Sequence, residues 1–188
     1  MTYVRLDGMA LEIVLLSNLR AGPVHGYELK RRVQRPLAAA LSNNSLYPIL
    51  NRLEQEGAVT HETQEVEGRP PRKVYTLTAV GRARLRAAIT VLPDALADDE
   101  EEFLLRVGFF AELTVDQRLA VVAARDAALD RRSAQLSALL DDMADPGPHP
   151  WRTLATRRVQ AQIAEERAWL TDLARDAATQ PEPEEGIR

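Results

Sequence analysis

Cysteine is absent from this chain of 188 residues, which excludes disulfide bonds, thiolate metal ligands and cysteine nucleophiles. Histidine is scarce, and His25, His61 and His149 lie far apart without a carboxylate cluster at ligand spacing. No glycine-rich phosphate loop, nucleophile and base pair, or pair of catalytic carboxylates can be identified. We therefore expect a protein that is not an enzyme and that has neither a cofactor nor a metal site.

Long apolar runs are also missing. The most apolar stretch, Met9 to Leu19, is interrupted by Glu12 and is too short to span a bilayer, and no signal-peptide cleavage pattern accompanies it. With the absence of cysteine, this favours a cytoplasmic location and no membrane partner.

The net charge of −4 hides an asymmetry along the chain. Residues 1–92 contain 13 Lys and Arg against 8 Asp and Glu, whereas residues 93–188 contain 11 against 20. A basic segment suits a partner with phosphate groups, and an acidic one is repelled by it. The first half is therefore the candidate for nucleic-acid binding.

The stretch Ser42 to Gly57 predicts a short amphipathic helix, here called the reading helix. Its apolar residues recur at helical spacing and form a packing face: Leu46, Ile49, Leu50 and Leu53. Pro48 places the start of the helix near Asn44 or Ser45, because proline is tolerated only in the first positions. The opposite face carries amides, a tyrosine and an arginine, which are side chains that suit base edges and phosphates in a major groove.

The order of elements around the reading helix is that of a winged helix-turn-helix. Helices are predicted over Met9 to Leu19 and from Gly26 to Gln34 or Arg35, with a stop at Pro36. After the reading helix two strands are predicted, Val59 to Glu67 and Arg72 to Leu77, on either side of a tip that contains Gly and Pro. Such a hairpin is the wing of a winged helix. Thr78 is the predicted N-cap of the helix that follows and that Pro93 ends.

The second half predicts long helices. The acidic run Asp94 to Glu102 is interpreted as a solvated linker and a helix N-terminus rather than a metal site. Thr114 to Gln117 is a capping box that opens a helix to about Met143, and a second long helix runs from Trp151 to about Ala178. Both helices carry apolar stripes, which a chain with its own N-terminal core has to bury against something else.

Three segments together resemble the PadR family of bacterial transcriptional regulators. They are His25 to Leu29, Leu41 to Gly57 with its Leu46-Tyr47-Pro48 and Arg52-Leu53-Glu54 elements, and Gly68 to Gly81 with its Gly-Arg-Pro tip. The resemblance covers about the first half of the chain. It implies a winged-helix DNA-binding domain followed by a helical dimerisation domain, as in the larger subfamily with several C-terminal helices.

We accordingly predict a mainly α fold with three domain segments. Residues 1–92 form a winged helix-turn-helix of three helices and a two-stranded wing, 93–178 a long-helix dimerisation domain, and 179–188 a disordered tail. The expected function is that of an effector-responsive repressor that binds a pseudo-palindromic operator in double-stranded DNA as a homodimer. The alternative is a winged-helix scaffold for protein contacts without specific DNA binding.

The predicted DNA-binding residues lie on the first helical turn after Pro23, on the reading helix and on the wing. They are Tyr27, Asn43, Asn44, Ser45, Tyr47, Pro48, Asn51, Arg52, Arg69, Arg72 and Lys73. For Tyr27, packing and a bond to a phosphate remain equal alternatives. The effector and its site are unknown; Trp151 and Trp169 are weak candidates for lining it, against a role as core or interface residues.

Overall fold

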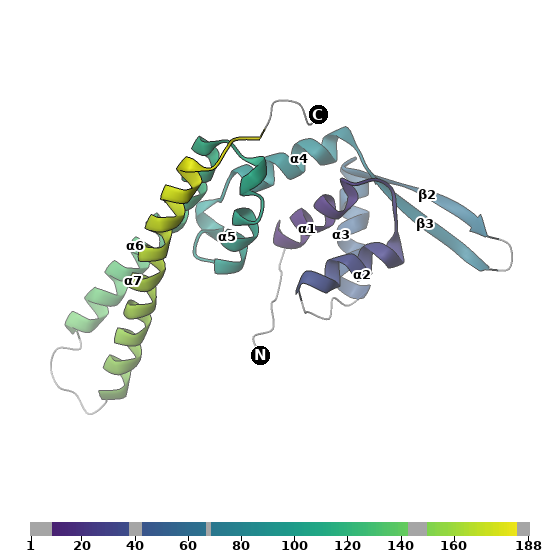
Figure 1. Cartoon of the computed structure of the whole chain (residues 1–188). Coiled ribbons are helices and arrows are strands. Elements are labelled where there is room, and N and C mark those ends of the chain that lie inside the picture. Colours follow the sequence, from purple (N-terminus) through teal and green to yellow (C-terminus); the bar gives the residue numbers. More distant parts are fainter. Residues whose placement is uncertain (1–8, 38–42, 67–68, 143–149, 184–188) are drawn as a thin grey trace. The chain divides into compact units, whose positions relative to one another are not determined.

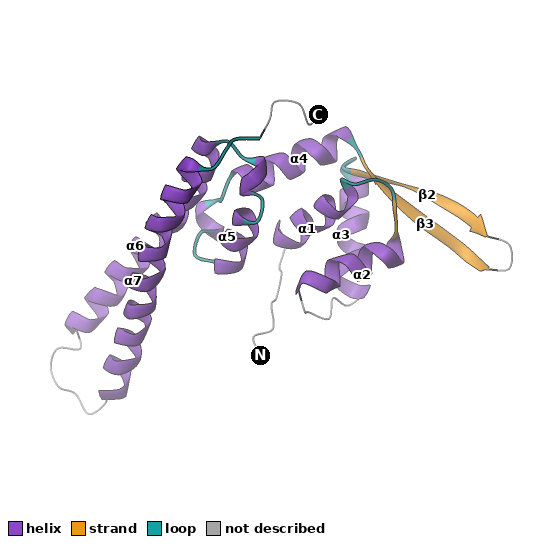
Figure 2. Ribbon diagram, in the orientation of Figure 1, coloured by secondary structure: helices purple, strands orange, loops and turns teal. Residues whose placement is uncertain are grey.

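The computed structural model describes residues 9–37, 43–66, 69–142 and 150–183 of the chain. It is mainly helical with one small antiparallel sheet (Figure 2), which confirms the predicted fold class with its N-terminal winged helix. The chain divides into two compact units, Met1–Ile89 and Thr90–Arg188.

The first unit begins with three helices, α1 (Met9–Leu19), α2 (Gly26–Leu37) and α3 (Asn43–Gln55), which lie together in Figure 1. Their core is aliphatic and includes fully buried residues from each: Leu11, Ile13, Leu15 and Leu16 of α1, Leu29 and Val33 of α2, and Leu46, Leu50 and Leu53 of α3. Helix α1 is buried along most of its length, as its apolar density predicts.

Two helix boundaries differ from the prediction, both at prolines. Helix α2 continues through Pro36 to Leu37, and α3 begins at Asn43, so that Pro48 is its sixth residue. A proline lacks the amide that would bond to the carbonyl four residues earlier, which for Pro48 is that of Asn44. One missing bond near a helix end is tolerated, so Pro48 limits the start of the helix less strictly than expected.

The sheet has three strands in the order β1 (Val24–His25), β3 (Arg69–Leu77) and β2 (Val59–Val66), all antiparallel. The β2–β3 hairpin is the predicted wing and extends away from the helices of its unit (Figure 1). Strand β1 was not predicted from the sequence, because two residues are too short to show alternation. It pairs Val24 with Tyr75 and His25 with Val74, and so places His25 in the sheet.

The junction between α3, the wing and α4 (Ala79–Thr90) is closely packed. Gly57 has a φ of 71°, and the amides of Gly57 and Ala58 donate to the carbonyls of Glu54 and Leu53, which is a Schellman cap on α3. The hydroxyl of Thr78 accepts a bond from the amide of Gly81, which confirms the predicted N-cap of α4. A Cβ on Gly81 would lie 2.1 Å from the carbonyl oxygen of Ala58, so only glycine fits there.

The second unit contains α5 (Glu100–Val107), α6 (Val115–Asp142), α7 (Pro150–Thr179) and two short 3-10 helices, Asp94–Leu96 and Phe110–Glu112. The Asp99 carboxylate accepts from two amides at the start of α5, as expected of the acidic run. Thr114 and Gln117 exchange side-chain to backbone bonds of 3.1 and 3.3 Å, which confirms the capping box of α6. Helix α5 ends at Val107, and the 3-10 helix Phe110–Glu112 follows it.

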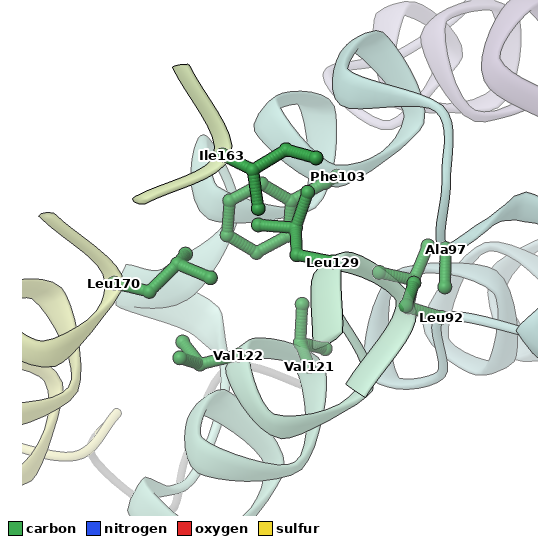
Figure 3. Packing of buried hydrophobic residues seen from close by; sticks show 9 residues of the cluster. Leu92, Ala97, Phe103, Val121, Val122, Leu129, Ile163 and Leu170 are labelled. Atoms are coloured by element: carbon green, nitrogen blue, oxygen red, sulfur yellow. The ribbon is translucent and has the colours of Figure 1, made fainter. Parts of the chain in front are cut away.

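The core of the second unit lies between α5, α6 and α7 (Figure 3). It contains the predicted stripe residues Val122, Leu129, Ile163 and Leu170 together with Phe103 and Val121. The guanidinium of Arg125 lies 5.9 Å from the centre of the Phe103 ring and donates to Glu166 and to the carbonyl of Ala97. A buried arginine is thus part of this core.

The structure describes residues 179–183 of the segment that is predicted to be a disordered tail. The buried side chain of Arg118 donates to the carbonyls of Gln180 and Pro181, and the Glu182 carboxylate accepts from the amide of Val115. Composition alone does not reveal these partners, because they lie more than sixty residues earlier in the chain. Residues 184–188 lie outside the described residues.

Candidate nucleic-acid interface

Helix α3 separates its packing face from its polar face as predicted. Leu46, Leu50 and Leu53 have no exposed surface, and Ile49 is half-buried. Tyr47, with 38% of its surface exposed, shares the outer side of the helix with Pro48 and Asn51, which are also exposed. Because Tyr47 and Asn51 are four residues apart, they lie one above the other on the same face.

Four of the predicted DNA-binding side chains lie outside the described residues, although their backbones are placed. Asn43, Asn44 and Ser45 form the first turn of α3, and Arg69 is the first residue of β3. Their roles stay predictions.

The wing carries its cations on two faces. Lys73 pairs with Thr63 and Arg72 pairs with Gln64, and all four side chains are exposed. Since side chains alternate along a strand, Lys73 lies on the face of the buried Tyr75, whereas Arg72 lies on the other face with Glu62. The predicted cluster of wing cations is therefore divided between the two sides of the hairpin.

Tyr27 stands at the start of α2 with 78% of its surface exposed. This exposure leaves its hydroxyl accessible, and its bond to a phosphate stays a prediction. On the same helix, Arg31 and Arg32 pair with Glu28, and these bonds, that of Arg32 foremost, lower the pKa of the Glu28 carboxyl.

Arg52 is placed differently from its neighbours on α3. Its Nη2 donates a hydrogen bond of 2.7 Å to the carboxylate of Glu12 on α1, of which only 6% is exposed. Arg84 of α4 donates to the same carboxylate, with its Nη2 at 3.0 Å, and also pairs with Glu56. We call Glu12, Arg52, Glu56 and Arg84 the Glu12 cluster; its bonds raise the pKa of the Arg84 guanidinium. The sequence shows Glu12 only as an interruption of an apolar run, which is the one available signal of this cluster.

A second polar contact joins α3 to the wing. Nδ1 of His61 on β2 is hydrogen-bonded to Oε1 of Glu54, and the His61 ring lies 5.7 Å from the ring of Tyr75. Burial raises the pKa of the Tyr75 hydroxyl. Together with the Schellman cap, this contact fixes the wing against the end of α3.

The two tryptophans of the second unit do not form one site. Both lie on α7, 18 positions apart, which corresponds to about 27 Å along a helix. Trp151 is 76% exposed, and Trp169 is 41% exposed with its ring edge against Phe103 at 6.0 Å. A groove of about 770 Å³ between α6 and α7 is lined by neither of them; Ala123, Arg167, Leu170 and Ala174 are among its residues.

Across the part of the chain that the structure describes, no group of three His, Asp or Glu residues is arranged to hold a metal ion. The helices of that part include none with the length and apolar character needed to cross a bilayer.

Comparison with known proteins gives a consistent result for the first unit. The model of the family described as "Transcriptional regulator PadR-like family" matches residues 15–87. The transcriptional regulator Rv3488 of Mycobacterium tuberculosis is 37% identical over 76 residues, which are 40% of this chain and 69% of that protein. The negative transcriptional regulator PadR of Bacillus subtilis is 28% identical over 134 residues, 69% of this chain and 70% of the relative.

The solved structures that the chain matches include that of Bacillus subtilis PadR in complex with operator DNA. It is 21% identical, covers 89% of this chain and 98% of the other, and has a TM-score of 0.39. The structure of smu.1704 from Streptococcus mutans is 31% identical, covers 46% of this chain and 78% of the other, and has a TM-score of 0.40. Because the family model spans the winged helix and a relative at 37% identity is matched over more than two thirds of its length, the chain belongs to the PadR-like family of transcriptional regulators.

Proposed function

We propose that this regulator binds double-stranded DNA as a homodimer and represses transcription from a pseudo-palindromic operator. The observation that carries the proposal is the outer face of α3, where Tyr47 and Asn51 are exposed opposite three fully buried leucines. A helix with such a face, followed by a hairpin with exposed cations, suits insertion into a major groove with the wing on the flanking backbone.

Repression is supported by the relative from Bacillus subtilis, whose name describes a negative transcriptional regulator. We propose base contacts for Asn51 and Tyr47 and, on sequence grounds, for Asn43, Asn44 and Ser45. Pro48 would shape the contact surface, and Tyr27, Arg69, Arg72 and Lys73 would bind phosphates or the minor groove.

The homodimer is supported by apolar side chains at one end of the α6–α7 pair. Leu139 near the end of α6, and Trp151 and Leu154 at the start of α7, are 40%, 76% and 55% exposed. The two helices run antiparallel, because Ser137 bonds to Gln160 while Asp126, earlier on α6, bonds to Arg167, later on α7. The three exposed apolar residues therefore lie at the same end of the pair. Burying them against a second copy would remove apolar surface from water.

Response to a small-molecule effector is the part of this proposal that rests on the family resemblance. Since the tryptophans are far apart, we expect one of them at most near an effector. The groove between α6 and α7 combines apolar alanine and leucine side chains with Arg167, and is where an effector would be sought first.

The test is selection of bound duplexes from a random pool with the purified full chain. An enriched inverted repeat, with half-sites about one helical turn apart, is the expected result. The salt dependence of binding to that duplex then distinguishes DNA binding from the alternative of a scaffold for protein contacts. DNA binding predicts an affinity that falls steeply as the salt concentration rises. A pool without enrichment and with no salt-dependent binding would instead favour the protein-interaction scaffold.

A further inference from the structure

The Glu12 cluster joins three helices of the first unit at one carboxylate. Glu12 comes from α1, Arg52 from α3 and Arg84 from α4, and Arg84 also reaches Glu56 just beyond the end of α3. The neighbours of Glu12 along α1, Leu11 and Ile13, are buried and apolar. An apolar residue at position 12 would avoid the cost of removing a carboxylate from water, so packing alone does not account for Glu12.

The position of Arg52 on α3 gives the cluster a geometric consequence. Arg52 directly follows Asn51, and adjacent residues on an α-helix are separated by about 100° around its axis. The three buried leucines of α3 set its rotation to a first approximation, and the 2.7 Å bond from the half-exposed Arg52 to Glu12 adds a polar contact that opposes further turning of the helix. Asn51 and Tyr47 lie on the same helix, so this contact also restrains the direction in which they face relative to α1.

We propose that Glu12 is a positioning residue for DNA recognition and that Arg52 acts through it, by setting the rotation of α3, and not by reading a base. This inference rests on the proposed function. It assigns to Arg52 a different role from the base contact that the sequence suggests, and it makes a residue on the core side of α1 a determinant of operator preference.

The two roles of Arg52 give opposite results when Glu12 is changed to glutamine. If Arg52 reads DNA directly, Glu12→Gln releases the arginine and removes a negative charge, so affinity for the operator is kept or rises. If Glu12 positions α3, Glu12→Gln lowers affinity for the operator relative to a scrambled duplex. We call the affinity for the operator divided by the affinity for a scrambled duplex the operator ratio. We expect the operator ratio to fall by about tenfold or more, the size of a lost base contact, while affinity for the scrambled duplex and the salt slope stay unchanged.

Further variants test whether the cluster acts as one device. Arg52→Gln should give the same loss of the operator ratio as Glu12→Gln, and the double variant should be no worse than either alone. Arg84→Gln should give a smaller loss, because it removes a second donor to Glu12 and leaves the bond from Arg52 in place. The matched control is Glu28→Gln, since Glu28 also accepts from two arginines, but both lie on its own helix. Its operator ratio should not change.

Binding is measured for the full chain on the duplex enriched by the wild type, with circular dichroism confirming that each variant is folded at the assay temperature. If Glu12→Gln is unfolded there, Arg84→Gln carries a prediction of the same direction and smaller size, because its side chain is 35% exposed. An operator ratio that stays at the wild-type value in a folded variant overturns the inference and leaves the proposed function standing. If the wild type itself enriches no duplex, both the inference and the proposed function are overturned.

Discussion

Nη2 of Arg118, near the start of α6, donates a hydrogen bond of 2.7 Å to the carbonyl of Pro181, beyond the end of α7. The same side chain is 1% exposed and also donates to the carbonyls of Phe110, Ala177 and Gln180. The carbonyl of Ala177 in the last turn of α7, which no helical amide can reach, and the two carbonyls just beyond the helix thus find a buried donor. One side chain therefore closes the second unit at the place where α6 begins and α7 ends.

Replacing Arg118 with methionine should destabilise the second unit strongly. The methionine keeps much of the volume but leaves buried carbonyl oxygens without a donor, which costs roughly 2 to 4 kcal/mol in the free energy of unfolding. Urea unfolding followed by circular dichroism measures this loss. Arg175→Met is the control, because Arg175 and its partner Asp172 are both about two-thirds exposed, and a change within about 0.5 kcal/mol is expected. Equal losses in the two variants would contradict the role assigned to Arg118.

Gly81→Ala should destabilise the first unit through a clash with backbone. The added Cβ would lie 2.1 Å from the Ala58 carbonyl oxygen, so α4 has to move away from the end of α3. We expect a loss of about 1 to 3 kcal/mol, measured as a lower thermal midpoint. At Gly26 the nearest atom to an added Cβ is Cε2 of the Tyr75 ring at 3.1 Å, which a small shift relieves, so Gly26→Ala should cost less.

Lys73→Ala should weaken DNA binding to all duplexes by a similar factor. Loss of one phosphate contact is expected to reduce the slope of log affinity against log salt by about one, without changing the preferred sequence. Arg158→Ala on α7 removes another exposed positive charge, from the second unit, and is the matched control. A slope that falls as much for Arg158→Ala would indicate an effect of net charge and not of the wing.

Asn51→Ala should change which bases the protein prefers at particular operator positions. An amide that pairs with a base edge contributes about 1 to 3 kcal/mol of discrimination, so the variant should lose selectivity at particular operator positions while its salt slope is kept. Competition binding with single-position operator variants measures this. A uniform loss across all positions would place Asn51 among the phosphate contacts.

The contribution of Glu28 to stability should depend on pH. Its folded pKa lies below its ordinary value of 4.5, because Arg32 and Arg31 bond to the ionised form. A lowered pKa means that the stabilisation is present above the unfolded value and is lost as the pH falls through the folded value. The thermal midpoint of Glu28→Gln should therefore lie below that of the wild type at neutral pH and approach it under acid conditions. A difference that grows on acidification would contradict the bonds assigned to Glu28.

The helices and the wing of this chain could be predicted from local signals. The leucine spacing of α3, the Thr114 and Gln117 capping box and the alternation in β3 each act over a few residues, so they are legible in the sequence. Strand β1 could not be predicted, since Val24 and His25 are extended because β3 lies beside them. The helix ends at Pro36 and Pro48 were placed too strictly, because a proline near the end of a helix removes only one bond.

The polar interior could not be predicted either. Arg106, Arg118 and Arg125 are almost completely buried, although arginine is usually exposed. Their partners are carbonyls and carboxylates that become neighbours only after folding, such as Ala97 and Glu166 for Arg125. For the same reason the bond from Arg52, which is about half exposed, to Glu12 on α1 could not be predicted.

The base of the wing is attached at both of its ends. The carbonyl of Ala58, next to the first residue of β2, accepts bonds from the amide and the hydroxyl of Thr78, which directly follows β3. The helices are thus independent of how far the hairpin extends beyond this point. Changes in the length or composition of its tip, whether during evolution or by grafting the tip of a related regulator, would leave the three-helix core intact. The wing can therefore diversify as an exchangeable module.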